Sequence, residues 1–232
     1  MTFRCIDRVP DDDLQDRLDR GNGRLEAAGD PEYFWPNGST LRVRFLDGLP
    51  GLHRQVMAAA AEWTARANLT LTVAERGPAE IRVTFGEPGN WSALGTMALF
   101  TEMFPADGPT MCLGEAPLTT PGRVALLARH EFGHALGLVH EHSSPAAGIR
   151  WNKPVVYREL GGAPNFWSPG MVDDNVFARY AADRTQFTEF DPKSVMLYPV
   201  PARWTLDGFG TVENTELSAA DLEFMAATYP GR

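Results

Sequence analysis

The first half of the chain alternates between hydrophobic and polar positions in a way that predicts a sheet covered by a helix. Every second residue is hydrophobic in three short stretches, 41–45, 69–73 and 81–85, which predicts half-buried strands. Between the first two stretches, hydrophobic residues recur three to four positions apart over 52–67, as in a helix that buries one face. The order strand, helix, strand, strand predicts a mixed sheet with a helix packed on it.

In the middle of the chain, an irregular stretch is followed by residues that are typical of the start of a helix. Glycines and prolines are scattered through residues 91–114, which predicts loops and irregular strands. Thr120 followed by Pro121 predicts the start of a helix, because threonine can accept a hydrogen bond from a free backbone N–H and proline has no N–H to leave unpaired. Hydrophobic positions continue to Leu136, so this helix should be well buried.

The last third of the chain shows little periodicity until its end. Over residues 140–175, Gly, Pro, Asn and Trp are frequent and no hydrophobic period is visible, which predicts an irregular segment. Ser218 and Asp221 have the spacing of a capping box, with aspartate in place of the usual glutamate. They predict a final helix that runs to about Thr228.

Four of the five histidines lie between residues 130 and 142. His130 and His134 are four residues apart in the predicted helix, so their imidazoles project from one face. Gly137 can adopt a left-handed conformation that ends the helix, and His140 can then approach from another direction. Three nitrogen ligands leave a tetrahedral zinc one open position, which is typical of a catalytic site. Glu131 follows the first histidine and is the candidate base for the bound water.

An ordinary surface helix is the alternative to this metal site. A pair such as His130 and His134 with an intervening glutamate also occurs by chance as a solvated or charge-paired face. The glycine and the third histidine at the required offsets favour the metal site. His142 should not coordinate, because a fourth protein ligand would close the open position. His53 is most simply a surface residue.

The eleven residues from His130 to His140 resemble the zinc-binding signature of the metzincin endopeptidases. The glutamate directly after them, Glu141, makes the sequence most similar to the astacin-like branch of that clan. The resemblance implies that this glutamate helps to organise the N-terminus of the mature protein through a buried charge pair. A plain surface carboxylate is the alternative for Glu141.

Residues 194–198, Ser-Val-Met-Leu-Tyr, resemble the Met-turn of the same clan. The resemblance implies that Met196 forms a hydrophobic floor beneath the metal. It also implies that Tyr198 approaches the zinc, as a ligand at rest or as a hydrogen-bond donor to the oxyanion. A buried packing methionine and a core tyrosine are the alternatives. Leu197 departs from the family, which usually has histidine at this position.

The resemblance implies an α+β, zincin-like (metzincin) fold. Such a fold has a mixed twisted sheet, two long helices above the cleft, an irregular lower half and a C-terminal helix. We expect a single catalytic domain over 35–232, with an upper half, 35–140, and a lower half, 141–232. The polar residues 1–34 would form an N-terminal arm or extension. Residues 92–98 are the expected edge strand on the upper rim of the cleft, which an extended peptide could join as an added strand.

The activity implied by the resemblance is that of a zinc-dependent metalloendopeptidase with one catalytic zinc ion, held by His130, His134 and His140. It would hydrolyse peptide bonds by attack of a zinc-bound water, with Glu131 as general base and Tyr198 as the second catalytic residue. Two alternatives remain. One is a catalytically silent zinc-bearing module that holds peptides, and the other is a processing protease for a single protein partner.

Composition narrows the class of partner. The chain has 232 residues, with 44% hydrophobic and 22% charged residues, as in an ordinary globular protein. Its net charge of −9 argues against nonspecific nucleic-acid binding, which requires a basic surface. We therefore expect a protein or peptide substrate, no nucleic acid, no membrane and a monomer. No apolar run of membrane-spanning length and no signal peptide are visible, so we expect a cytoplasmic protein or export by a non-classical route, whereas the resemblance favours secretion.

The two cysteines, Cys5 and Cys112, could form one disulfide bridge or remain free thiols. A thiolate at Cys5 or a carboxylate at Asp30 could occupy the open position of the zinc and keep the enzyme latent. A small packed or exposed thiol is the alternative for Cys5.

Overall fold

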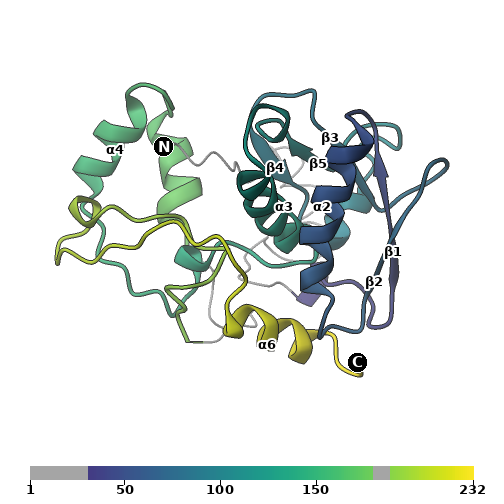
Figure 1. The fold of residues 1–232 in the computed structure, drawn as a ribbon. Helices are drawn as coiled ribbons and strands as arrows, with labels where there is room; N and C mark the ends of the chain where they lie inside the picture. Colours follow the sequence, from purple (N-terminus) through teal and green to yellow (C-terminus); the bar gives the residue numbers. More distant parts are fainter. Residues whose placement is uncertain (1–30, 180–188) are drawn as a thin grey trace.

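A five-stranded sheet lies on one side of the protein (Figure 1), of which the computed structural model describes residues 31–179 and 189–232. The spatial order of the strands is β2-β1-β3-β5-β4. Neighbouring strands are parallel except β4, which runs antiparallel to β5 at one edge. The predicted mixed sheet is therefore confirmed. The strands are β1 (Thr40–Phe45), β2 (Thr70–Val73), β3 (Ile81–Thr84), β4 (Asn90–Ser92) and β5 (Met111–Leu113).

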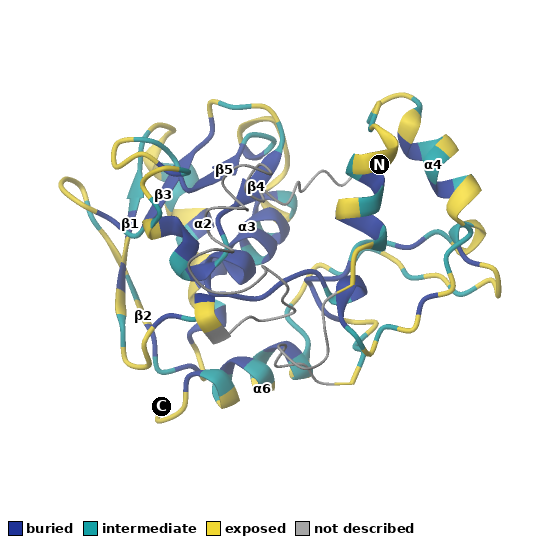
Figure 2. Cartoon of the chain, turned by 180° about the vertical axis from the view of Figure 1, so that it is seen from behind, coloured by how far each residue is buried: buried dark blue, intermediate teal, exposed yellow. Residues whose placement is uncertain are grey.

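Two long helices, α2 (Pro50–Trp63) and α3 (Pro121–Ala135), pack against each other, and α3 also contacts β4 and β5. Dark blue marks these buried surfaces in Figure 2, where α3 is buried along most of its length. The remaining α-helices are α4 (Lys153–Gly161), α5 (Pro169–Val172) and α6 (Ala219–Thr228). Short 3-10 helices are η1 (Pro31–Tyr33), η2 (Gly95–Leu99), η3 (Ala116–Leu118), η4 (Glu141–Ser143) and η6 (Ala202–Trp204), and η5 (Asp173–Phe177) is a π-helical turn. This arrangement confirms the predicted α+β, metzincin-like fold.

The first predicted helix ends earlier than expected, at Trp63 instead of residue 67. The chain beyond Trp63 is held by the C-terminal residue, because Arg232 Nη1 donates to the carbonyl oxygens of Thr64, Ala67 and Leu69. Carbonyl groups that would otherwise need helical partners are satisfied in this way. Ala67 is buried as predicted, but outside the helix.

The prediction of an edge strand at residues 92–98 is wrong. The edge strand is the shorter β4, and most of the predicted segment belongs to the 3-10 helix η2. Gly95 has a positive φ of 46°, and a Cβ added there would overlap the carbonyl oxygen of Tyr33. The close approach of these two backbones requires glycine and ends the extended conformation.

The prediction of an irregular segment over residues 140–175 is only partly correct, because it contains α4 and α5. Their buried positions Val156, Leu160 and Val172, together with Val176, form a small hydrophobic cluster separate from the main core. A helix of nine residues that buries only two side chains gives too short a hydrophobic period to be recognised. Residues 1–30, with the expected arm, Cys5 and Asp30, lie outside the described part of the chain.

Aromatic side chains fix the end of α3, whose last carbonyl groups have no partner within the helix. Trp35 Nε1 donates to the carbonyl of Ala135 at 2.8 Å. The Tyr229 hydroxyl donates to the carbonyl of Leu136 at 2.8 Å and accepts from the backbone N–H of Trp35 at 3.2 Å. Tyr229 is 1% exposed, so a buried residue after α6 caps the end of α3.

We predict that Tyr229→Phe lowers the free energy of unfolding by about 1–3 kcal/mol, because one buried carbonyl and one buried N–H each lose a partner. Chemical denaturation of the zinc-loaded protein measures this loss. The matched control is Tyr157→Phe, since the hydroxyl of Tyr157 donates to the half-buried Asp173, which water can reach. An equal loss in the two variants would contradict the prediction.

Candidate active site

Helix α3 carries the first two histidines of the site. The Thr120 side chain accepts a hydrogen bond from the N–H of Arg123, which confirms the predicted N-cap. At the other end Gly137 has a φ of 101°, and a Cβ there would lie 2.5 Å from Phe34 Cδ1. The predicted left-handed turn is therefore present, and it is followed by a bond from Leu138 N–H to the carbonyl of Gly133.

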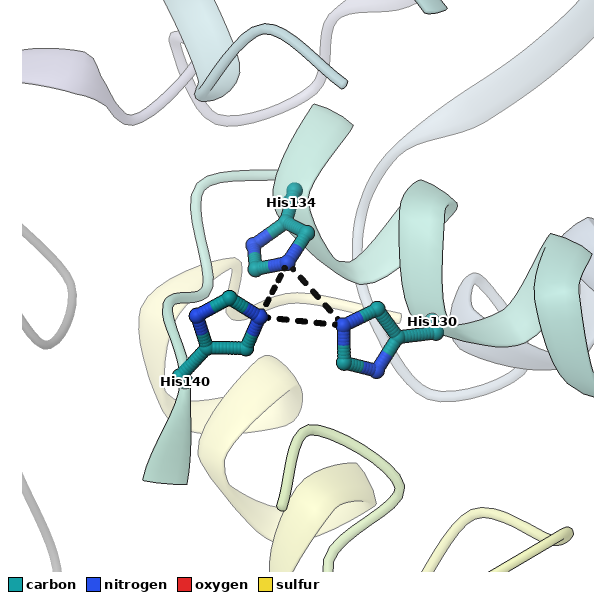
Figure 3. Close-up of side chains that lie close together, drawn as sticks. All are labelled: His130, His134 and His140. Carbon is teal, nitrogen blue, oxygen red and sulfur yellow. Dashed lines mark hydrogen bonds between the residues drawn. The ribbon is translucent and has the colours of Figure 1, made fainter. Parts of the chain in front are cut away.

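His130, His134 and His140 converge as the sequence predicts (Figure 3). Their Nε2 atoms form a triangle in which every side is 3.2 Å. His130 and His140 are fully buried, and His134 is 4% exposed. Two of the rings project from α3 and the third enters from the segment after the turn.

The proton positions make this triangle an acceptor site. Nδ1 of His130 lies 2.8 Å from the carbonyl of Val195, and Nδ1 of His134 lies 2.8 Å from the carbonyl of Leu138. Carbonyl oxygens only accept, so both Nδ1 atoms carry the proton and both neutral rings direct a lone pair from Nε2 into the triangle. Burial lowers the pKa of His130 and His140 well below the ordinary value, which keeps these rings neutral.

Lone pairs that face one another at this distance need a cation between them, and the geometry fits zinc. A tetrahedral zinc with bonds of about 2.0–2.1 Å separates two nitrogen ligands by about 3.3–3.4 Å, close to the sides of the triangle. The bonds from Nδ1 to backbone carbonyls are the outer contacts that orient imidazole ligands in metal sites.

The Met-turn contacts His130 of this triangle and is bonded to α6. Asp221 Oδ1 accepts from the Ser194 hydroxyl at 2.7 Å, and Oδ2 accepts from the N–H of Val195 and of Ser218 at 3.1 and 2.9 Å. The same carboxylate completes the predicted capping box of α6. The carbonyl of Val195 then accepts from His130, so α6 is connected to a candidate ligand through one turn of chain.

Met196 is 1% exposed and sits against α3. A Cβ added at Gly133 would overlap Met196 Sδ and lie 3.0 Å from Trp63 Cζ2. Tyr198 is half-buried, and its ring lies 4.2 Å from the ring of His140, measured between centroids. The structure therefore places Met196 against α3 and the Tyr198 ring beside His140.

Comparison with solved structures agrees with this geometry. One structure of myroilysin is 39% identical over 88% of this chain and 98% of that chain, with a TM-score of 0.84. The chain belongs to the astacin-like metzincins. As an astacin-like enzyme it is a zinc metalloendopeptidase that uses one zinc ion, and the group of three histidines fits a zinc site.

Two further comparisons extend the similarity. A second myroilysin structure is 36% identical over 98% of this chain and 91% of that chain, with a TM-score of 0.67. High choriolytic enzyme 1, a hatching enzyme zinc-protease from Oryzias latipes, is 16% identical over 87% of this chain and 96% of that chain, with a TM-score of 0.59, and shows the shared fold alone. Neither the family models nor the curated proteins give a match.

Two carboxylates of the astacin-like signature are enclosed in the protein. Glu131 is fully buried directly after His130. Glu141 accepts from the N–H of Asp191 at 2.8 Å, and burial, with Asp221 and Asp191 nearby, raises its pKa to about 7. Glu141 is therefore not a plain surface carboxylate.

Sequence reasoning missed the groups that orient the site. Asp221 was expected only as a helix cap, and the carbonyls of Leu138 and Val195 carry no side-chain signal. His142 was expected not to coordinate and is outside the ligand group, yet it is 1% exposed and stacks on Tyr198. Cys112 carries a free thiol whose pKa burial raises to about 11, so it stays protonated.

We predict that Gly133→Ala destabilises the zinc-loaded enzyme by about 1–3 kcal/mol, because the added methyl group overlaps Met196 and crowds Trp63. The displaced Met-turn should also lower activity. The measurements are the free energy of unfolding and turnover.

The same substitution at Gly122, in the first turn of the same helix, is the control. No heavy atom lies within 4 Å of a Cβ added there, so Gly122→Ala should be neutral or stabilising by up to about 1 kcal/mol. Equal unfolding free energies for the two variants would show that the Met-turn does not restrict this position.

Proposed function

We propose that this astacin-like enzyme hydrolyses internal peptide bonds of proteins or peptides, with His130, His134 and His140 as zinc ligands, Glu131 as general base and Tyr198 as oxyanion donor. The observation that carries the proposal is the triangle of Nε2 atoms, two of which have fixed lone pairs. When bound, zinc supplies Lewis acidity, which acidifies a water molecule and polarises the substrate carbonyl.

The place of Glu131 in the chain and its burial support the role of general base. It follows a candidate ligand on α3 and is fully buried. A carboxylate in such a low-dielectric site can take the proton of the attacking water and return it to the leaving amine nitrogen. The water oxygen forms the new bond to the carbonyl carbon while the bond from carbon to nitrogen breaks, so the carboxylate ends the cycle ionised again.

Tyr198 can stabilise the charge that develops on the carbonyl oxygen. A phenol can donate a hydrogen bond through its O–H group. The ring lies beside His140 and at 6.2 Å from the ring of His130, and this proximity to two candidate ligands supports a role at the reacting centre. A donor that is already positioned there favours the tetrahedral oxyanion over the planar substrate.

The substrate backbone has a natural partner in β4. This strand is at the edge of the sheet and contacts α3, which carries the site. An extended peptide can add to such an edge through main-chain hydrogen bonds, in any sequence that the side-chain pockets accept. A cavity of 280 Å³ beside Tyr198, walled mostly by apolar residues of the segments 159–167 and 199–204, offers room for a substrate side chain.

The catalytic unit that we propose is the expected domain, residues 35–232. Among the described residues, none of the helices has both the length and the apolar character needed to cross a membrane.

We predict that Glu131→Gln lowers kcat by about 100- to 10,000-fold, because the amide cannot accept the proton, while bound zinc stays at one ion per chain. Cleavage of a denatured protein and a mixed peptide library, with metal content measured in parallel, provides the test. Chelation of zinc should abolish cleavage, and restoring zinc should recover it.

The control is Glu75→Gln, at an exposed position, which should leave kcat unchanged. Equal cleavage by Glu131→Gln and the unmodified enzyme would remove the assignment of the base. Zinc binding with no cleavage by the unmodified enzyme would instead indicate a silent peptide-binding module, and cleavage at one sequence only would indicate a dedicated processing protease.

We predict that Tyr198→Phe lowers kcat by about 100-fold or more, with little change in zinc content, because one oxyanion donor is lost. Steady-state kinetics on a single peptide separate kcat from KM. Tyr157→Phe is the matched control, as its hydroxyl bonds Asp173 and not the site. An unchanged kcat for Tyr198→Phe would limit this residue to packing.

A further inference from the structure

His142 is buried beside the candidate zinc ligands without joining them. It is 1% exposed, and the ligand group among the described residues consists of His130, His134 and His140. A buried imidazole next to a metal site that binds no metal calls for another explanation. Its contacts point to Tyr198.

The ring of Tyr198 contacts two imidazoles, which also contact each other. His142 stacks on it with ring centroids 4.6 Å apart and an angle of 23° between the planes. His140 touches it at 4.2 Å with an angle of 42°, and the two histidines lie 5.2 Å from each other. Tyr198 is thus in contact with one candidate ligand and with one residue whose position does not depend on coordination.

The position of His142 is set by contacts with residues later in the chain. Its Nε2 lies 3.0 Å from the carbonyl of Asn175, so Nε2 carries the proton and donates. Asn175 belongs to the π-helical turn η5, and its Nδ2 donates to the carbonyl of Met171 at 2.9 Å. The ring of Trp151 meets His142 edge-on at 6.3 Å. A hydrogen bond and an aromatic contact therefore fix the imidazole plane.

We propose that His142 is a positioning residue that holds the Tyr198 ring where its hydroxyl can reach the oxyanion. This inference rests on the role proposed above for Tyr198. A tyrosine hydroxyl moves with two side-chain torsions, so a ring packed on one face by a fixed plane has far fewer orientations. Phenylalanine at this position would stack equally well but would lack the bond to Asn175, which explains why a histidine is used.

The test is a double-mutant cycle of His142→Ala and Tyr198→Phe, with kcat, KM and zinc content measured for all four proteins. His142→Ala alone should lower kcat by about 10- to 100-fold, because a displaced donor loses most of its effect, and should change KM little. With Tyr198→Phe already present, the same change should lower kcat by less than about twofold, because the group that His142 positions is gone.

Each other outcome overturns the inference in a distinguishable way. An equal loss from His142→Ala in both backgrounds would mean that His142 acts independently of Tyr198. Loss of zinc in His142→Ala would make it a structural support of the ligands. A full kcat for Tyr198→Phe alone would refute the proposed role of Tyr198, and this inference with it, while leaving the assignment of Glu131 intact.

A second variant separates the effect of the stacked ring of His142 from that of its hydrogen bond. It also replaces His142→Ala in the test if that variant does not fold. His142→Phe keeps the stacked ring and should retain more of kcat than His142→Ala, whereas equal losses would overturn the stacking role. His53→Ala is the matched control. His53 also stacks on an aromatic ring, Phe45, at 4.1 Å and bonds a backbone carbonyl, that of Asp47, at 2.7 Å, so its removal should leave kcat unchanged.

Discussion

Three neutral imidazoles that direct nitrogen atoms at one point form the constraint on which the rest of the structure depends. Two of these rings donate from Nδ1 to backbone carbonyls, so their free nitrogens can only accept. Acceptors at 3.2 Å from one another repel unless a cation lies between them. The site therefore gains stability from a metal ion, and a protein that binds the ion only when folded is stabilised by it.

Holding the rings in this arrangement requires contacts from distant parts of the chain. The carbonyl that orients His130 belongs to the Met-turn, and the Met-turn is fixed by Asp221 at the start of α6. After the same helix, Tyr229 caps the end of α3, from which His134 projects. The C-terminal helix thus supports the site from both sides, although none of its residues approaches the metal position.

Features that depend on contacts between residues near in sequence could be predicted, and features that depend on distant residues could not. The N-cap at Thr120, the left-handed Gly137 and the convergence of the histidines depend on contacts within about one or two helical turns, and all were visible in the sequence. The early end of α2 depends on Arg232, and the short edge strand depends on the approach of Tyr33 to Gly95. Such contacts join residues far apart in sequence and leave no local pattern.

The same distinction separates the parts of the active site. Ligands and base share one short motif, because a helix and a turn are sufficient to bring them together. The environment of Tyr198 is assembled from three segments, since His142 follows the motif while Trp151 and Asn175 come from the part of the chain without hydrophobic period. The local motif thus brings the candidate ligands together, whereas the surroundings of the proposed oxyanion donor depend on packing within the lower half. Variation in the segments that contain Trp151 and Asn175 can then alter the surroundings of Tyr198 while the contacts of the Met-turn with His130 stay the same.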